Sequence, residues 1–91
     1  MDTITECFDY CIKQGGRHAE ANHLRAHLDA WDLLNATCTL IARGSDYADD
    51  AKATCAKAVK RCEESCEEFG DDQMMKACAD VCREAYEHLA S

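Results

Sequence analysis

Regularly spaced cysteines constrain this chain more than any other feature of its sequence. Cysteine pairs separated by three residues occur three times, and one pair is preceded by a further cysteine seven residues upstream. Residues four and seven apart lie on one face of an α-helix. The spacing therefore predicts helices whose sulfur stripes line a common interior with Cys7, Cys11, Cys55, Cys62, Cys66, Cys78 and Cys82.

Glycines separate four helical segments. Proline is absent, and the four glycines, at positions 15, 16, 44 and 70, fall where a helical pattern ends. Short connections between amphipathic helices make neighbours antiparallel. We therefore expect an all-α, antiparallel up-down-up-down four-helix bundle with a Cys-lined core and a short first helix, forming one domain over residues 1–91.

Capping residues and apolar periodicity predict the helix starts and the inward faces. The helices are predicted to start at a capping box from Thr3 to Glu6, at about Arg17 or Ala19, after Ser45 or Asp46, and after Asp71 or Asp72, and the second to end at Arg43. The inward residues are predicted to be Leu24, Leu28, Trp31, Leu34, Cys38 and Ile41 on the second helix; Ala48, Ala51, Cys55, Ala58, Cys62, Cys66 and Phe69 on the third; and Met75, Cys78, Cys82, Ala85 and Leu89 on the fourth. His27 lies beside the second stripe, and Glu63 is expected mostly outside.

Charge and length narrow the choice of partners. A formal charge of -8 and a pI near 4.8 argue against nucleic acid and anionic membrane surfaces. The first residues lack the features of a secretory signal, so we expect a cytoplasmic protein. Thiols are kept reduced there, which favours metal binding over a disulfide scaffold. Ninety-one residues with few large apolar side chains give a lean core, so a homo-oligomer is expected.

Thiophilic metal ions fit the cysteine pattern. Cu(I) is soft and accepts two or three thiolates, which each Cys-x3-Cys pair supplies one helical turn apart. Zn(II) is a second candidate, because Cys62 and Cys66 together with Cys78 and Cys82 would offer four thiolates. The sequence therefore predicts a metal-binding protein, with Cu(I) as the first choice.

Soft donors other than thiolate are predicted at one end of the bundle. The second and fourth helices start at the same end, which brings His23 and Met75 near each other. We expect these side chains to bind or guide the metal, together with His27, which lies four residues after His23 on the same helix. No strand or glycine-rich loop presents a nucleophile, so no enzymatic activity is expected.

Two other interpretations of the cysteines stay open. Twin Cys-x3-Cys motifs close two disulfides across a helical hairpin, Cys62 to Cys82 and Cys66 to Cys78, and would give a structural protein that acts through protein contacts. Cysteine also packs as a small buried hydrophobe, which explains Cys38 alone equally well.

These residues resemble those of the four-helix-bundle copper storage proteins, whose sequences carry short Cys-rich repeats. The likeness covers about residues 23–89 and rests on Leu28-Asp29-x-x-Asp32 and on segments 55–67 and 78–85. The resemblance implies a bundle that stores many Cu(I) ions along a Cys-lined core, commonly as a tetramer. The lack of a leader resembles the cytosolic branch of the family.

By the register of that family, this chain is a Cys-depleted, divergent member. Six positions that usually carry Cys hold His23, Ala30, Leu34, Met75, Ala85 and Leu89. The resemblance implies that the metal ligands are Cys7, Cys11, Cys38, Cys55, Cys62, Cys66, Cys78 and Cys82, with His23 and Met75 at the entrance.

Overall fold

The computed structural model describes residues 2–90, which are helical almost throughout. No strand occurs in this part of the chain, and no helix in it is long and apolar enough to cross a membrane. The predicted all-α four-helix bundle is therefore confirmed. Its elements are α1 (Asp2–Gln14), the short 3-10 helix η1 (Gly16–Ala19), α2 (Ala21–Ala42), α3 (Ala48–Glu67) and α4 (Gln73–Ala90).

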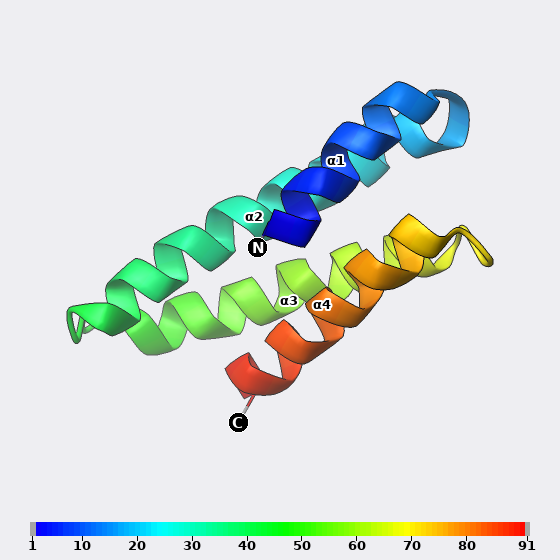
Figure 1. Cartoon of the computed structure of the whole chain (residues 1–91). Helices are drawn as coiled ribbons and strands as arrows, with labels where there is room; N and C mark the ends of the chain where they lie inside the picture. The colour runs from blue at the N-terminus through cyan, green and yellow to red at the C-terminus, as the bar shows by residue number, and fades with distance from the viewer. Residues whose placement is uncertain (1, 91) are drawn as a thin grey trace.

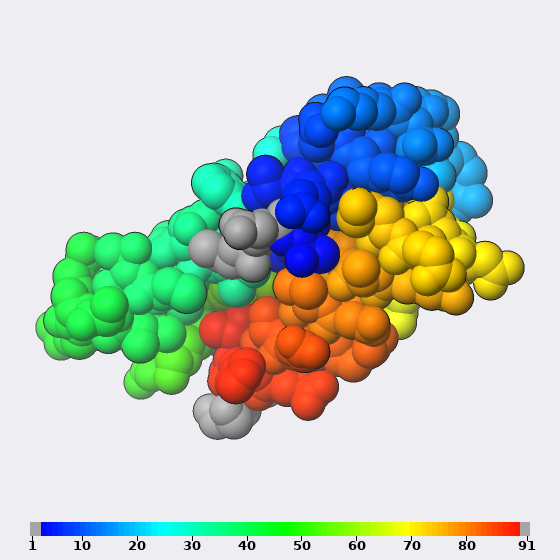
Figure 2. Space-filling view, viewed as in Figure 1, coloured from blue at the N-terminus to red at the C-terminus, as the bar shows by residue number. Residues whose placement is uncertain are grey.

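The four α-helices form a ring in which each packs against two others. α2 packs on α3 and α3 on α4, and α1 closes the ring by contacting both α2 and α4 (Figure 1). At 1.5 Å per residue, the 13-residue α1 is about 20 Å long and the 22-residue α2 about 33 Å. α1 therefore covers only part of the α2–α3 hairpin, whose far end projects past it (Figure 2).

The glycines end the helices as the sequence predicts, whereas three of the four predicted helix starts are wrong. α1 already includes Asp2, so Thr3 lies inside the helix and is not its cap. Gly44 and Gly70 have φ of 65° and 57°, the left-handed conformation that glycine adopts at little cost. The predicted start of α2 falls in η1, because Glu20 has an extended backbone that separates η1 from α2. α3 begins only at Ala48, because Ser45 accepts hydrogen bonds from the backbone of the next residues and forms a turn before the helix.

The inward face of α2 differs from the predicted apolar stripe. Leu28, Trp31 and Ile41 are 45%, 40% and 44% exposed, and Cys38 is exposed as well. The helix is rotated so that two imidazoles meet the sulfurs of the core and small side chains let the neighbouring helices approach. The buried residues of α2 are His23, Ala26, His27, Ala30, Leu34 and Thr37.

Glu63 also differs from the prediction. Its side chain is buried, with 4% exposed, and does not lie on the outer face of α3. Its carboxylate Oε2 accepts a hydrogen bond of 3.1 Å from Nε of Arg83 on α4, and Lys60 Nζ lies 3.4 Å from Oε1. Buried carboxylates need such partners. The inward stripe of α4 is as predicted, with Met75, Cys78 and Cys82 fully buried.

Asp72 caps α4 and ties three elements together. Its Oδ1 accepts hydrogen bonds from the backbone N–H groups of Met74 (3.0 Å) and Met75 (3.1 Å), as the sequence predicts for a capping residue. Its Oδ2 accepts the Tyr10 hydroxyl of α1 at 2.8 Å and lies 3.1 Å from His18 Nε2 of η1. Although burial opposes its ionisation, these hydrogen bonds lower the pKa of Asp72.

We predict that Asp72→Ala lowers the free energy of unfolding by about 1–3 kcal/mol, because it removes the cap and the link to α1. The charged form of Asp72 contributes stability above the ordinary carboxyl pKa, and this is lost as pH falls through the lowered pKa of the folded state. Urea denaturation of the reduced, metal-free protein at several pH values measures both effects. Asp72→Asn is the matched control, since it keeps a capping oxygen and lacks the charge. Equal stability of Asp72→Ala and the unchanged protein would contradict this role.

Candidate metal centre

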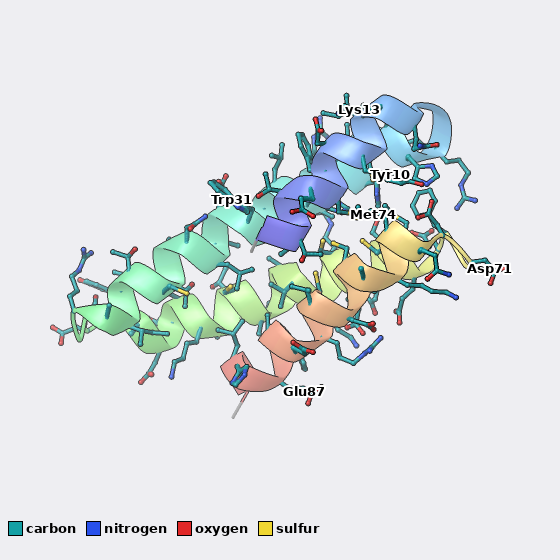
Figure 3. All side chains as sticks on the ribbon, in the orientation of Figure 1. Tyr10, Lys13, Trp31, Asp71, Met74 and Glu87 are labelled. Carbon is teal, nitrogen blue, oxygen red and sulfur yellow. The ribbon has the colours of Figure 1, made fainter. Side chains whose placement is uncertain are left out.

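Seven of the eight cysteines have their sulfurs inside the bundle. Cys7, Cys11, Cys55, Cys62, Cys66, Cys78 and Cys82 are each 0–1% exposed. Sulfur atoms, drawn in yellow in Figure 3, gather between the helices. All eight cysteines are free thiols in the structure. The exposed Cys38 shows that the expected inward orientation of this residue is wrong.

The first donor group has one residue on each of the four helices. It contains Cys7 of α1, His27 of α2, Cys66 of α3 and Cys78 of α4, and the four ligand atoms all lie within 4.8 Å of one another. His27 Nε2 is 3.2 Å from Cys7 Sγ, 3.5 Å from Cys66 Sγ and 3.6 Å from Cys78 Sγ. The imidazole therefore points its Nε2 atom at three sulfurs.

The second donor group lies beside the first, toward η1. Cys11 Sγ is 3.2 Å from His23 Nε2, and His27 completes the group. His23 Nδ1 lies 2.6 Å from the Ser65 hydroxyl, which fixes the ring from its other side. Met75 Sδ is 3.8 Å from Cys11 Sγ and 3.9 Å from Cys7 Sγ. The structure thus brings the predicted residues His23 and Met75 to the cysteines of α1.

The third donor group is made by α3 and α4 alone. It contains Cys62, Cys78 and Cys82, whose sulfurs all lie within 4.8 Å of one another. The four-thiolate set proposed for Zn(II) is divided between two groups, because Cys66 belongs to the group around His27. Cys55 belongs to no donor group of three or more among the described residues.

The pKa values of the clustered thiols diverge because the thiols hydrogen-bond to one another. Hydrogen bonds from neighbouring thiols, that of Cys62 first, lower the pKa of Cys78, whereas hydrogen bonding to Cys62 raises the pKa of Cys82. A hydrogen bond from Cys7 lowers the pKa of Cys11 to about 5, against the effect of burial.

His27 supplies a positive charge to these thiols. Burial disfavours the charged imidazole, but contact with the Cys78 sulfur raises the pKa of His27 to about 9. A buried thiolate is costly unless a cation lies beside it. The lowered pKa of Cys78 and the raised pKa of His27 favour an ion pair between this sulfur and the imidazolium, whereas the pKa values of Cys7 and Cys66 are raised and favour neutral thiols at these two residues.

A surface cleft leads to the second donor group. It has a volume of about 350 Å³ and lies between the start of α2 and the end of α3. His23 lines this cleft, together with Ser65 and Phe69. His23 thus contacts the cleft on one side and the Cys11 sulfur on the other.

His27 is fully buried at the centre of the donor groups. The sequence pairs it with His23, four residues earlier on the same helix face, as a candidate ligand or guide for a metal. Its central place could not be predicted, because it depends on sulfurs from the other three helices.

The fold and the donor groups define the class of this protein: a helical bundle with a thiol- and imidazole-lined interior suited to metal binding. The family model described as copper storage protein matches residues 1–90. The chain therefore belongs to the copper storage protein family. Comparison with curated proteins and with solved structures gave no match. Family membership and the Cys/His groups together support metal binding and copper storage.

We predict that a thiol reagent modifies one cysteine of the native, reduced, metal-free protein rapidly and the other seven slowly. Only Cys38 is exposed, and a reagent reaches the buried thiols only when the bundle opens. Timed alkylation followed by mass spectrometry gives the count, and the protein in denaturant, with eight fast sites, is the control. Loss of the fast site in Cys38→Ser would identify it, and several fast sites in the native protein would contradict this packing.

Proposed function

We propose that this protein stores or buffers Cu(I) on thiolates inside the bundle. The observation that carries the proposal is the burial of seven thiols in a chain of the copper storage protein family. Soft Cu(I) is satisfied by two or three thiolates, and the donor groups offer sulfurs in such numbers. Each bound ion compensates thiolate charge in the dry interior and releases protons from the thiols it binds.

The proposed ligands follow from the placement of each candidate. They are the sulfurs of Cys7, Cys11, Cys55, Cys62, Cys66, Cys78 and Cys82, with His23 and Met75 beside the pair on α1. Cys38 is left out of the ligand set because its side chain is exposed.

His23 is the proposed entry point for the ion. An ion that enters the cleft meets the His23 ring first. Cys11 Sγ lies 3.2 Å from His23 Nε2, and Met75 Sδ lies 3.8 Å from Cys11 Sγ, so the next ligands are close by. Transfer between soft ligands a few ångströms apart needs no fully dissociated ion. The ion then reaches the thiols shared by α3 and α4.

We propose that the protein catalyses no reaction and works in the cytoplasm. Storage requires thiols that stay unoxidised, and cytosolic reductants keep them so. Bound in the interior, Cu(I) is held away from dioxygen and from small thiols.

We predict that the fully reduced protein takes up about three to six Cu(I) ions per chain, from the number of buried thiolates and two-thiolate ligation. Anaerobic titration against a competing Cu(I) chelator measures the capacity and the affinity. Replacing Cys62 and Cys82 together by Ser is expected to reduce the capacity by about one or two ions. Cys38→Ser is the matched control, because it removes a thiol that lies outside the donor groups, and it should keep the full capacity.

Zero copper per chain under reducing conditions contradicts the proposal. The intact mass, measured before reduction, tells whether disulfide bonds account for the missing copper uptake. A mass lower by the hydrogens of two disulfides would favour the stapled hairpin with Cys62–Cys82 and Cys66–Cys78, whose partners each lie in one donor group.

The proposal also includes self-association through the outer face of α2. Leu28 and Trp31 are half-exposed there and border an apolar groove of about 240 Å³ that also involves Ile4 and Phe8 of α1. Figure 3 shows Trp31 on the outside of the bundle. A lean bundle gains stability by burying such a surface against a second copy.

We predict that Trp31→Glu shifts the protein to a monomer at micromolar concentration, because a buried charge would then face the partner copy. Sedimentation velocity measures the change. Tyr86→Glu, on the outer face of α4, is the control and should leave the assembly intact. Monomeric behaviour of the unchanged protein would contradict the interface.

A further inference from the structure

We propose that Cys7, His27, Cys66 and Cys78 form one preorganised tetrahedral Cys3His site for a divalent ion of the Zn(II) class, which joins all four helices. This inference goes beyond Cu(I) storage, because it concerns a different ion and a structural role. A Cys-x3-Cys pair offers two thiolates from one helix, whereas this cluster offers three thiolates and an imidazole from four helices.

The distances match the edges of a tetrahedron around Zn(II). With Zn–S near 2.3 Å and Zn–N near 2.0–2.1 Å, ideal geometry puts each sulfur about 3.6 Å from the nitrogen and about 3.8 Å from the other sulfurs. The three N–S distances from His27 Nε2 are 3.2, 3.5 and 3.6 Å, and the sulfurs lie within 4.8 Å of one another. Binding therefore requires movements of only a few tenths of an ångström at the nitrogen and at most about 1 Å at the sulfurs.

The orientation of His27 is that of a metal ligand. His27 Nδ1 lies 3.0 Å from the backbone carbonyl oxygen of His23. A carbonyl oxygen only accepts hydrogen bonds, so Nδ1 keeps its proton, and Nε2 is the atom that gives up a proton and binds the ion. Ligating histidines are commonly held in this way, with the other ring nitrogen donating to a carbonyl or a carboxylate. The ring is therefore fixed with Nε2 aimed at the three thiols.

Each helix contributes one ligand, and this gives the ion a structural effect. Cys7 lies on α1, the shortest helix and the one that would be easiest to detach from the ring. An ion bound to one residue of every helix joins elements that are distant in sequence. The energy of binding then stabilises the folded state, as in small proteins that depend on structural zinc.

The number of ligands suits a divalent ion at this position. Four ligands in a tetrahedron satisfy Zn(II), whereas Cu(I) on thiolates needs only two or three. Binding leaves three thiolates and a neutral imidazole on the ion and releases three protons, whether the free site holds three thiols and a neutral imidazole or one thiolate, two thiols and an imidazolium. The complex of Zn(II) with three thiolates and a neutral imidazole carries one net negative charge, which is a small charge for a buried site.

The test is an anaerobic titration of the reduced full-length protein with Co(II), followed by Zn(II). We expect one equivalent of Co(II) to give the intense visible d–d bands of a tetrahedral ion together with sulfur-to-cobalt charge transfer, and Zn(II) to displace it. Zn(II) should also raise the midpoint of thermal unfolding. Weak, octahedral-type absorption would overturn the proposal.

Variants identify the ligands. His27→Ala should weaken Co(II) binding by about tenfold or more and abolish the stabilisation by Zn(II). Because His27→Ala also leaves a space in the core, His27→Cys is the second variant, and it should keep a tetrahedral ion with stronger charge transfer from a fourth sulfur. Cys38→Ser is the matched control and should bind as the unchanged protein does. An unaltered Co(II) spectrum in both His27 variants would overturn the proposal.

Cys62→Ser separates this site from a four-thiolate one. It should keep the Co(II) spectrum while lowering the Cu(I) capacity, because Cys62 belongs to the third donor group alone. Loss of the Co(II) spectrum in Cys62→Ser would overturn the Cys3His assignment. Cu(I) uptake without tetrahedral Co(II) would overturn this site and leave copper storage standing, and the reverse result would overturn storage only.

Discussion

The interior of this bundle depends on a positive charge placed among the thiols. A buried thiolate is costly unless a positive charge lies beside it and compensates the negative one. His27 does this in the metal-free protein, with Nε2 3.2–3.6 Å from three sulfurs and with its pKa raised to about 9. A divalent cation that binds to this group replaces three protons, so the net charge of the group changes by only one unit.

The position of His27 explains why α2 is rotated away from its apolar stripe. Turning Leu28 and Trp31 inward would bury more carbon but would withdraw the imidazoles from the sulfurs. The thiolates would then lack a counter-charge. The observed rotation leaves large apolar side chains in solvent and places Ala26 and Ala30 where the helices meet. Polar contacts in the core, not apolar area, therefore set the orientation of this helix.

The sequence predicts the parts of this structure that depend on local rules. Glycine positions mark the ends of the helices, the cap of α4 is at Asp72, and cysteine spacing predicts the inward stripes of α1, α3 and α4. The rotation of α2 and the burial of Glu63 depend on partners from other helices, namely the sulfurs of α1, α3 and α4 and the guanidinium of Arg83. Periodicity within one helix carries no information about such partners.

The short α1 divides the bundle into two unequal compartments. Where α1 overlaps the other three helices, all four contribute donors. The first two donor groups each contain a cysteine of α1, and the third shares Cys78 with the first. The α2–α3 hairpin also holds Cys55 and the exposed Cys38, which belong to no donor group among the described residues. Cys78 belongs both to the group that α1 completes and to the group made by α3 and α4 alone, so a single sulfur links the two sets of donors.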